Sequence, residues 1–334
     1  MTALALHLSA YLREHLPRER AVSPHTVKTY ANCFVLLVQF AADRLKRRPT
    51  DLEVEDLGTD MIMAFLDHVE IGRGSCVRTR NGRLAAIRSF FRYIEYRIPA
   101  CLDQALRVRA IPTKKTDKAL IDYLDRAEIK ALLDTPDPRT RLGTRDRAML
   151  HLTYAGGLRV SELVTLQLGD FPDRSLSTMH IMGKGRRERV LPLWKETQIA
   201  LRAWLAIRPQ VEVTEIFLNA NGQPMTRDGF AFRLAEHVKT AATKQPSILG
   251  KRVTPHVLRH SCAMHTLAAT GDIRKVALWL GHASIQSTET YLRADPEEKL
   301  QILAAHGAPA IKPGRFKPPS DALITMLTDV RRRA

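Results

Sequence analysis

The sequence contains few cysteines, and their spacing argues against two common kinds of site. Its four cysteines are Cys33, Cys76, Cys101 and Cys262, and no two of them form a C-x-x-C pair. Such scattered thiols predict neither a disulfide framework nor a cysteine zinc centre. We therefore expect all four to be small, buried, apolar residues.

Long apolar runs are also lacking. A typical long run, residues 33–42 (CFVLLVQFAA), is far shorter than the roughly 20 residues that a helix needs to span a bilayer. The chain does not open with a basic and then apolar leader ending at small residues. We expect a cytoplasmic protein without a membrane partner.

Acidic residues are outnumbered by basic ones. The 52 Lys and Arg residues against 35 Asp and Glu give a net charge of +17 and a pI near 10.1. The basic excess is present in residues 1–112, 113–300 and 301–334 alike. A polyanion, most simply double-stranded DNA, is therefore the expected partner, held by both folded parts of the chain. A basic protein without such a partner is the alternative.

The first hundred residues have the pattern of helices joined by short turns. Ser23 is placed to cap a helix with Pro24 at its first position, and residues 59–72 and 75–97 repeat the apolar spacing of a helix. The last of these segments carries five arginines, for which solvent exposure and DNA contact are equally open: Arg78, Arg80, Arg83, Arg88 and Arg92. We expect a helical DNA-binding domain over residues 1–106, followed by a basic linker at 107–119.

The rest of the chain predicts a second domain, residues 120–300, and a tail, 301–334. Asp125 and Glu128 match a capping box, and Thr254 with Pro255 matches a helix start that Gly271 ends. Residues 176–193 (LSTMHIMGKGRRERVLPL) change to two extended runs around a turn with a lysine, which predicts a hairpin. The expected fold is mainly α with a small antiparallel β element.

Six polar residues of the second domain stand beside turns or helix ends, where side chains can converge on a ligand: Arg159, Lys184, His256, Arg259, His282 and Tyr291. Singly, each has an ordinary structural explanation, such as an ion pair between Arg159 and Glu162. The H-x-x-R pair formed by His256 and Arg259 is more specific, because both lie on one face near a helix N-terminus, which favours a phosphate. Arginines could neutralise a phosphoryl transition state, a lysine could protonate a leaving alkoxide, and a tyrosine could attack once its proton is removed.

A metal site is the competing interpretation of the same helix. His256, His260, Cys262 and His265 fall within ten residues, and the first two have the i, i+4 spacing of a helical metal pair. The glutamate of H-E-x-x-H is replaced by Val257, and nearby arginines would repel a cation. We expect no metal and no other cofactor.

Four segments together resemble the tyrosine recombinases, also called the phage integrase family. In chain order they are AGGLRVSELVTLQLGD, GKGRRERVLPL, TPHVLRHSCAMHTL and LGHASIQSTETYL, within residues 120–300. The resemblance implies that Tyr291 is the nucleophile, that Glu162 supports the site, and that the remaining members activate the phosphate: Arg159, Lys184, His256, Arg259 and His282. The N-terminal helices resemble the core-binding (SAM-like) domain of that family.

The function that this resemblance implies is site-specific DNA recombination through a 3′-phosphotyrosyl intermediate and a free 5′-hydroxyl, without a small-molecule substrate. Members act as four protomers on two duplexes, so a homotetramer or a heteromeric recombinase assembly is expected. The 43 residues after Tyr291 favour an integrase or transposase of a mobile element over Xer-type chromosome or plasmid dimer resolution. A topoisomerase-like relaxing enzyme and a non-cleaving DNA-binding member are the alternatives. The tail either contacts a neighbouring protomer or packs on its own domain.

Overall fold

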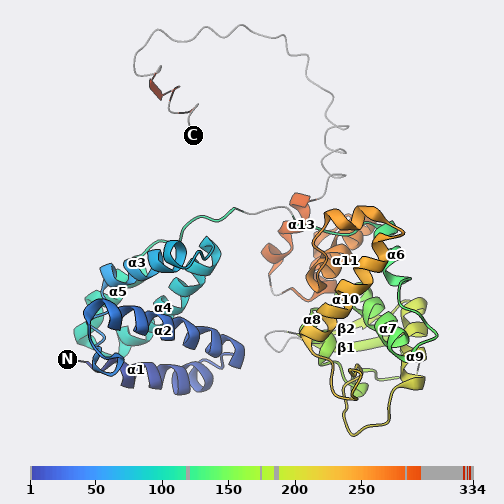
Figure 1. The fold of residues 1–334 in the computed structure, drawn as a ribbon, viewed down its shortest axis with the longest axis horizontal. Helices are drawn as coiled ribbons and strands as arrows, with labels where there is room; N and C mark the ends of the chain where they lie inside the picture. The colour runs from blue at the N-terminus through green and yellow to red at the C-terminus, as the bar shows by residue number, and fades with distance from the viewer. Residues whose placement is uncertain are drawn as a thin grey trace. The chain divides into compact units, whose positions relative to one another are not determined.

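The computed structural model describes residues 2–117, 121–173, 175–183, 188–282 and 284–294, together with 326, 327, 329 and 331. The chain divides into two compact units, Met1–Lys118 and Ala119–Ala334 (Figure 1). Each unit has its own hydrophobic core. Nearly all of the tail lies outside the described residues.

The first unit is a group of helices around an aromatic core. Ser23 Oγ accepts a hydrogen bond from the backbone N–H of Thr26, and Pro24 occupies the first helical position, which confirms the predicted helix start. Tyr11, in a π-helical stretch, contacts the rings of Phe34 and Phe90 edge-on. The helices of this unit are α1 (Leu4–Ala10), α2 (Pro24–Leu45), α3 (Thr59–Asp67), α4 (Val77–Arg97) and α5 (Leu102–Ala110).

The expected linker begins later than its composition suggests. Helix α5 runs through Ala110, so residues 107–110 are helical and not linker. Ala105 and Val108 of this helix are fully buried in the core of the first unit. Burial of these two side chains stabilises the helix through this basic segment. The basic composition by itself predicted a linker instead of a helix.

The five arginines of α4 do not share one environment. Arg80 is 1% exposed and forms an ion pair with Glu70 at 3.6 Å, so neither solvent nor DNA surrounds its side chain. Arg88 is partly buried and donates a hydrogen bond to the carbonyl oxygen of Ile111. Arg78 and Arg92 are exposed, so both solvent exposure and DNA contact remain compatible with their positions.

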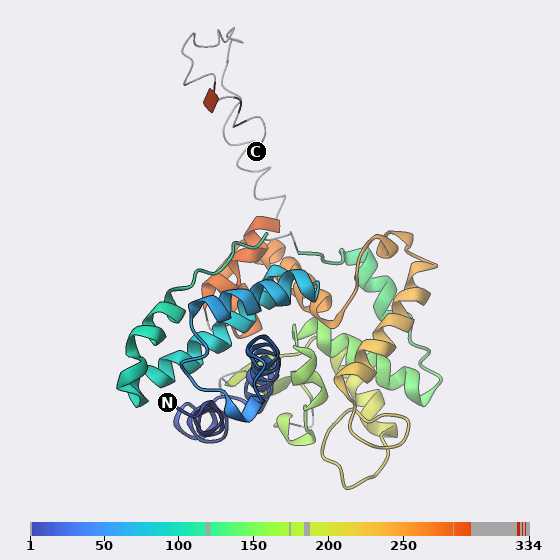
Figure 2. The ribbon, with the colours of Figure 1, turned by 60° about the vertical axis from the view of Figure 1, so that its left-hand side comes forward.

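The described part of the second unit is mainly helical (Figures 1 and 2) and contains a two-stranded antiparallel sheet, as predicted (Figure 1). Strand β1 (Thr178–Met182) pairs with β2 (Glu188–Pro192), with Met179 opposite Leu191. Asp125 and Glu128 form the predicted capping box. The helices are α6 (Arg126–Leu133), α7 (Arg141–Ala155), α8 (Val160–Val164), α9 (Lys195–Ile207), α10 (Arg227–Ala242), α11 (Pro255–Thr270), α12 (Ile273–Leu280) and α13 (Glu289–Ala294).

Local signals fix the ends of α11 and α12. Thr254 Oγ1 accepts a hydrogen bond from the backbone N–H of Val257, and Gly271 ends α11 with φ +60°. Gly281 ends α12 in the same left-handed conformation, with φ +63°. These ends place the H-x-x-R pair within the first two turns of α11 and His282 directly after α12.

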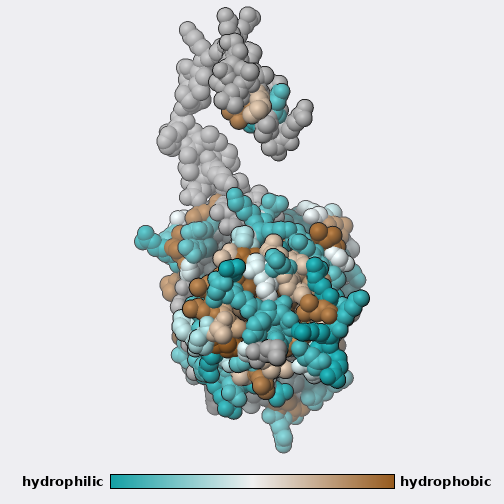
Figure 3. All heavy atoms as spheres, turned by 90° about the vertical axis from the view of Figure 1, so that its left-hand side faces the viewer, coloured by the Kyte–Doolittle hydropathy of each residue, from teal (hydrophilic) through white to brown (hydrophobic). Residues whose placement is uncertain are grey.

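Most of the surface drawn in Figure 3 is hydrophilic, with hydrophobic side chains in small, separate groups. Individual apolar side chains such as Ile71 and Tyr96 are nonetheless 81% exposed. Within the described part of the chain, none of the helices has the length and apolar character to cross a membrane.

The cysteine prediction is wrong at one position. Cys33, Cys101 and Cys262 are buried, but Cys76 is exposed. Cys76 immediately precedes α4, and its thiol lies close to the hydroxyl of Thr79. A residue at a helix start is exposed to solvent unless another element packs over it. The residue type alone does not predict whether such packing occurs.

Candidate active site

A glycine turn between α7 and α8 positions the first arginine of the site. Gly157 has φ +54°, and a Cβ atom there would lie 2.5 Å from Leu280 Cδ2. Only glycine lets this turn approach the end of α12 so closely. The turn leads to Arg159, whose backbone N–H donates to Glu162 Oε2 at 3.0 Å and whose Nη1 donates to Oε1 at 2.7 Å.

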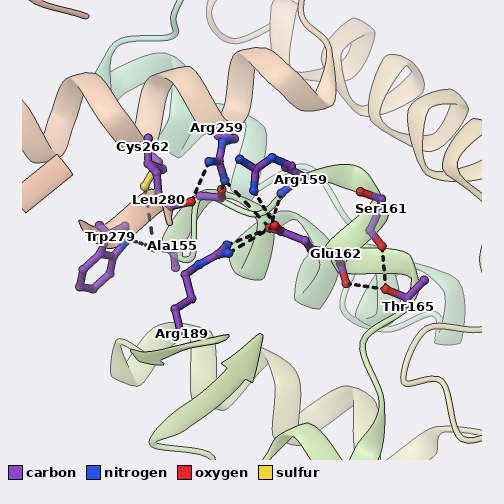
Figure 4. A network of polar contacts seen from close by, with 11 residues as sticks. Ala155, Arg159, Ser161, Glu162, Thr165, Arg189, Arg259, Cys262, Trp279 and Leu280 are labelled. Carbon is purple, nitrogen blue, oxygen red and sulfur yellow. Dashed lines mark hydrogen bonds and ion pairs between the residues drawn. The ribbon is translucent and has the colours of Figure 1, made fainter. Parts of the chain in front are cut away.

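The second arginine, Arg259, is fixed in the interior by backbone carbonyls. It is 2% exposed, Nη2 donates to the carbonyl oxygen of Leu280 at 2.8 Å, and Nη1 donates to that of Gly157 (Figure 4). Burial, reinforced by the positive charge of Arg159, lowers the pKa of Arg259 to about 10. The guanidinium therefore keeps its charge at neutral pH, in a place where water screens it poorly.

Glu162 is the carboxylate around which the arginines gather. Burial by itself would raise its pKa, but hydrogen bonds from Arg189 and Arg159 hold the pKa below the ordinary value. Nη1 of Arg259 lies 4.0 Å from Glu162 Oε2. Three guanidinium groups around one carboxylate leave an excess of positive charge, which suits a phosphate group.

Tyr291 lies beside this positive cluster, in α13. It is 2% exposed, and its hydroxyl shares a hydrogen bond of 3.1 Å with His260 Nδ1. The ring of His282 lies nearly parallel to it, at an interplanar angle of 10° and a centroid distance of 6.3 Å. Burial raises the pKa of Tyr291 to about 12, so the hydroxyl keeps its proton at neutral pH until another group removes it.

The histidines around Tyr291 are neutral at physiological pH. Burial and, next, the charge of Arg259 lower the pKa of His282 to about 4, and burial with His256 lowers that of His260 to about 4. His282 Nδ1 shares a 2.7 Å hydrogen bond with the hydroxyl of Thr288. Because that nitrogen is engaged, a contact from this ring to a substrate would use Nε2.

The structure brings most of the predicted residues together. Arg159, Glu162 and Arg259 form one ion-pair cluster, and Tyr291 and His282 form one ring contact. The charges of Arg259 and Arg159 also lower the pKa of His256, after the effect of burial. Lys184 lies outside the described residues.

The sequence did not predict two further residues of the site, Arg189 and His260. Arg189 donates two hydrogen bonds to Glu162, and His260 contacts the hydroxyl of Tyr291. Strand alternation carried a signal for Arg189, because it stands two residues before the buried Leu191 and shares its face. For His260, the i, i+4 spacing from His256 indicated only a metal pair.

Family models match both units of the chain. Residues 122–298 match the phage integrase family, and residues 8–97 match the phage integrase N-terminal SAM-like domain. The chain belongs to the phage integrase family. Members of this family, the tyrosine recombinases, cut and rejoin DNA strands, so the predicted fold and the predicted reaction are confirmed for this chain.

Two curated relatives extend over almost the whole chain. The protein y4rC of Sinorhizobium fredii, provisionally named an integrase/recombinase, is 39% identical over 328 residues, which cover 98% of each chain. The tyrosine recombinase XerC of Myxococcus xanthus is 35% identical over 310 residues, covering 90% of this chain and 97% of that relative. Both alignments include the two units.

Solved structures agree on the fold. XerH recombinase in a post-cleavage complex with its difH substrate has a TM-score of 0.64 at 20% identity, covering 89% of this chain and 85% of that one. The Tn1549 transposon integrase in complex with transposon right end DNA has a TM-score of 0.62 at 18% identity, covering 91% and 100%. At these identities the likeness concerns the fold.

The lowered histidine pKa values predict an acid-sensitive fold. Burial is the first cause of the shift at His151, His260 and His282, whose pKa values are all about 4. Between roughly pH 6.5 and 4 the unfolded chain binds protons that the folded chain does not, so stability falls as the pH falls through this window. Thermal unfolding midpoints measured from pH 7.5 to 4.5 should show this decline.

A matched pair of variants checks the assignment of that pH dependence. His282→Asn should flatten the decline, whereas His180→Asn, at an exposed position of β1, should leave it unchanged. A midpoint that is level between pH 6.5 and 4.5 in the unmodified protein would contradict the prediction.

Proposed function

We propose that this protein is a site-specific recombinase of a mobile element and that Tyr291 is its nucleophile. The observation that carries the proposal is the placement of the Tyr291 ring beside His260 and His282, next to a cluster with three arginines. In the proposed step the Tyr291 oxygen bonds to the scissile phosphorus, and the bond from phosphorus to the 5′-oxygen breaks. The products are a 3′-phosphotyrosyl link and a free 5′-hydroxyl.

Each neighbouring residue has a chemical task in this proposal. Arg159 and Arg259 bind the non-bridging oxygens and offset the charge that develops in the pentavalent transition state. Neutral His260 is positioned to accept the phenolic proton, since its Nδ1 shares a hydrogen bond with the Tyr291 hydroxyl. We assign a phosphate contact to His282, through Nε2, because its Nδ1 is bonded to Thr288. We assign protonation of the departing 5′-oxygen to Lys184 and a further phosphate contact to His256.

The reverse of this step, with a 5′-hydroxyl from a second duplex, joins the exchanged strands. The energy of the broken phosphodiester is kept in the tyrosyl ester, so the exchange needs no nucleotide hydrolysis. Exchange of both strands between two duplexes uses four tyrosines, which supports an assembly of four protomers. The length match with y4rC, 98% of each chain, supports an integrase, and the XerC likeness supports dimer resolution as the second candidate.

The test is to trap and map the covalent intermediate. The full-length protein is incubated with nicked duplexes that carry a randomised core, in the presence of EDTA, and the reaction is stopped with detergent. Loss of a short nicked fragment with its 5′-hydroxyl should leave a covalent protein–DNA complex. After nuclease and protease digestion, the nucleotide mass should be found on the peptide that contains Tyr291.

Two outcomes would overturn the proposed chemistry: absence of any covalent complex, and attachment at another residue. The recovered core sequences also separate the two biological candidates. Matches to the DNA flanking the gene support an integrase of a mobile element. A single match elsewhere on the chromosome favours dimer resolution.

A further inference from the structure

Arg189 is a largely buried cation whose two terminal nitrogens both donate to Glu162, whereas its Nε is buried without a partner among the described residues. It lies in β2, its side chain is 9% exposed, and its register partner in β1 is Ile181. Nη2 donates to Glu162 Oε2 at 2.8 Å and Nη1 donates to Oε1 at 3.3 Å (Figure 4). Burying a guanidinium is costly unless its charge is compensated, and here Glu162 supplies the compensation.

The hydrogen bonds of Glu162 are completed by Arg189. An ionised carboxylate offers about four acceptor positions. Arg159 uses two of them, through its backbone N–H and Nη1, and Arg189 uses the other two. Arg259 therefore stays at 4.0 Å from the carboxylate and directs its own donors to the carbonyls of Gly157 and Leu280.

Removal of Arg189 would change how the hydrogen-bond donors are shared around Glu162. Two acceptor positions of a buried carboxylate would lose their donors, which is unfavourable. The nearest remaining cation is Arg259, which needs a movement of about 1 Å to replace the 4.0 Å separation with a hydrogen bond. That movement would withdraw Arg259 from the phosphate position.

The alkyl part of Arg189 also sets the turn that carries His282. A Cβ atom on Gly281 would lie 2.9 Å from Arg189 Cδ and 3.0 Å from its Nη1, so the backbone of Gly281 rests directly against this side chain. Leu280, just before, supplies a carbonyl to Arg259, and His282 follows immediately. One side chain thus contacts both the carboxylate between the arginines and the turn between Leu280 and His282.

We propose that Arg189 is a positioning residue: it occupies Glu162 so that Arg259 remains available to the phosphate, and it fixes the Leu280–His282 turn. This inference rests on the proposed function of the site. It assigns Arg189 no contact with the DNA, so its removal changes the rate of cleavage on bound DNA and not the affinity for DNA.

The experiment compares Arg189→Gln, Arg189→Lys and the control Arg202→Gln in the full-length protein. Arg202 is an exposed arginine of α9 that donates to the carbonyl of Ser175 and, within the described part of the chain, forms no hydrogen bond or ion pair with Glu162 or Tyr291. At saturating nicked DNA, Arg189→Gln should form the covalent complex about 10- to 100-fold more slowly, as expected for a sub-ångström to 1 Å misplacement of reacting groups. Arg189→Lys keeps the charge but cannot donate bidentately, so its rate should lie closer to that of Arg189→Gln than to the unmodified rate.

Two glycine substitutions test the contact between Arg189 and the backbone of Gly281. Gly281→Ala and Gly271→Ala impose the same left-handed strain, because φ is +63° and +60°, but nothing lies within 4 Å of a Cβ atom at Gly271. Gly281→Ala should therefore slow cleavage at least about 10-fold more than Gly271→Ala, because it displaces Arg189. Combining Gly281→Ala with Arg189→Gln should add little to the larger single loss, since both act through one side chain.

Three measurements make the outcome decisive: the rate at saturating DNA, the DNA concentration giving half that rate, and the thermal midpoint of each variant. The inference is overturned if folded Arg189→Gln cleaves at the unmodified rate. It is also overturned if the half-saturating concentration, and not the saturating rate, changes. Failure of the proposed function is distinct, because then the unmodified protein forms no Tyr291 complex at all.

Discussion

Tyr291→Phe is expected to abolish the covalent DNA complex while leaving the fold and DNA binding intact. The substitution removes only the hydroxyl, whose described partner is His260 Nδ1 at 3.1 Å. The aromatic ring remains to fill its buried site against His282. Because the oxygen that bonds to phosphorus is gone, no residual rate through this pathway is expected. The measurement is denaturing electrophoresis of the complex on nicked DNA, together with equilibrium binding to the same DNA.

Tyr154→Phe is the matched control for this prediction. Tyr154 belongs to the same unit, and its hydroxyl also shares a hydrogen bond with a histidine of α11, His265 Nδ1 at 2.8 Å. Burial raises its pKa to about 12, as it does for Tyr291. Loss of the Tyr154 hydroxyl should leave complex formation within a few-fold of normal. Equal losses in both variants would mean that a buried tyrosine–histidine contact, and not a nucleophile, is being measured.

The helix ends were predictable from the sequence because they depend on neighbouring residues. Thr254, Pro255 and Gly271 specify the beginning and end of α11 through a side-chain cap, a fixed φ and a left-handed φ. Several predicted site residues were found by the same local logic: His256 and Arg259 stand near the start of α11, Arg159 precedes α8, and His282 follows the end of α12. Four separated motifs then supplied the family, which spacing alone does not provide.

The contacts inside the site were not predictable in this way, because they join residues distant in sequence. Arg189 and Glu162 are 27 positions apart, and His260 and Tyr291 are 31 apart. Each contact depends on how a strand or helix packs against another element. The burial of Arg80 was more predictable from the sequence. Leu84 and Ile87, at i+4 and i+7, place Arg80 on the helix face that packs into the core.

Substitution of Arg259 is expected to have a large effect on the cleavage rate. The charge of Arg259 is buried, so we expect it to interact mainly with a ligand bound in the site. It is 2% exposed, its two terminal nitrogens donate to the carbonyls of Gly157 and Leu280, and Glu162 is 4.0 Å away. A side chain so enclosed adds little to the long-range attraction of DNA, which depends on exposed cations. Its energetic effect should appear when negative charge builds on the scissile phosphate.

Arg259→Ala should therefore slow formation of the Tyr291 complex by about 10²- to 10³-fold, the effect of removing one preorganised donor, with DNA affinity nearly unchanged. Arg259→Lys should recover little, because a lysine keeps the charge but lacks the planar fork that reaches two oxygens. Arg202→Ala, an exposed arginine on α9, should behave in the opposite way and weaken binding slightly without changing the rate on bound DNA. A fall in affinity that accounts for the whole loss in Arg259→Ala would show that this arginine holds DNA and does not stabilise the transition state.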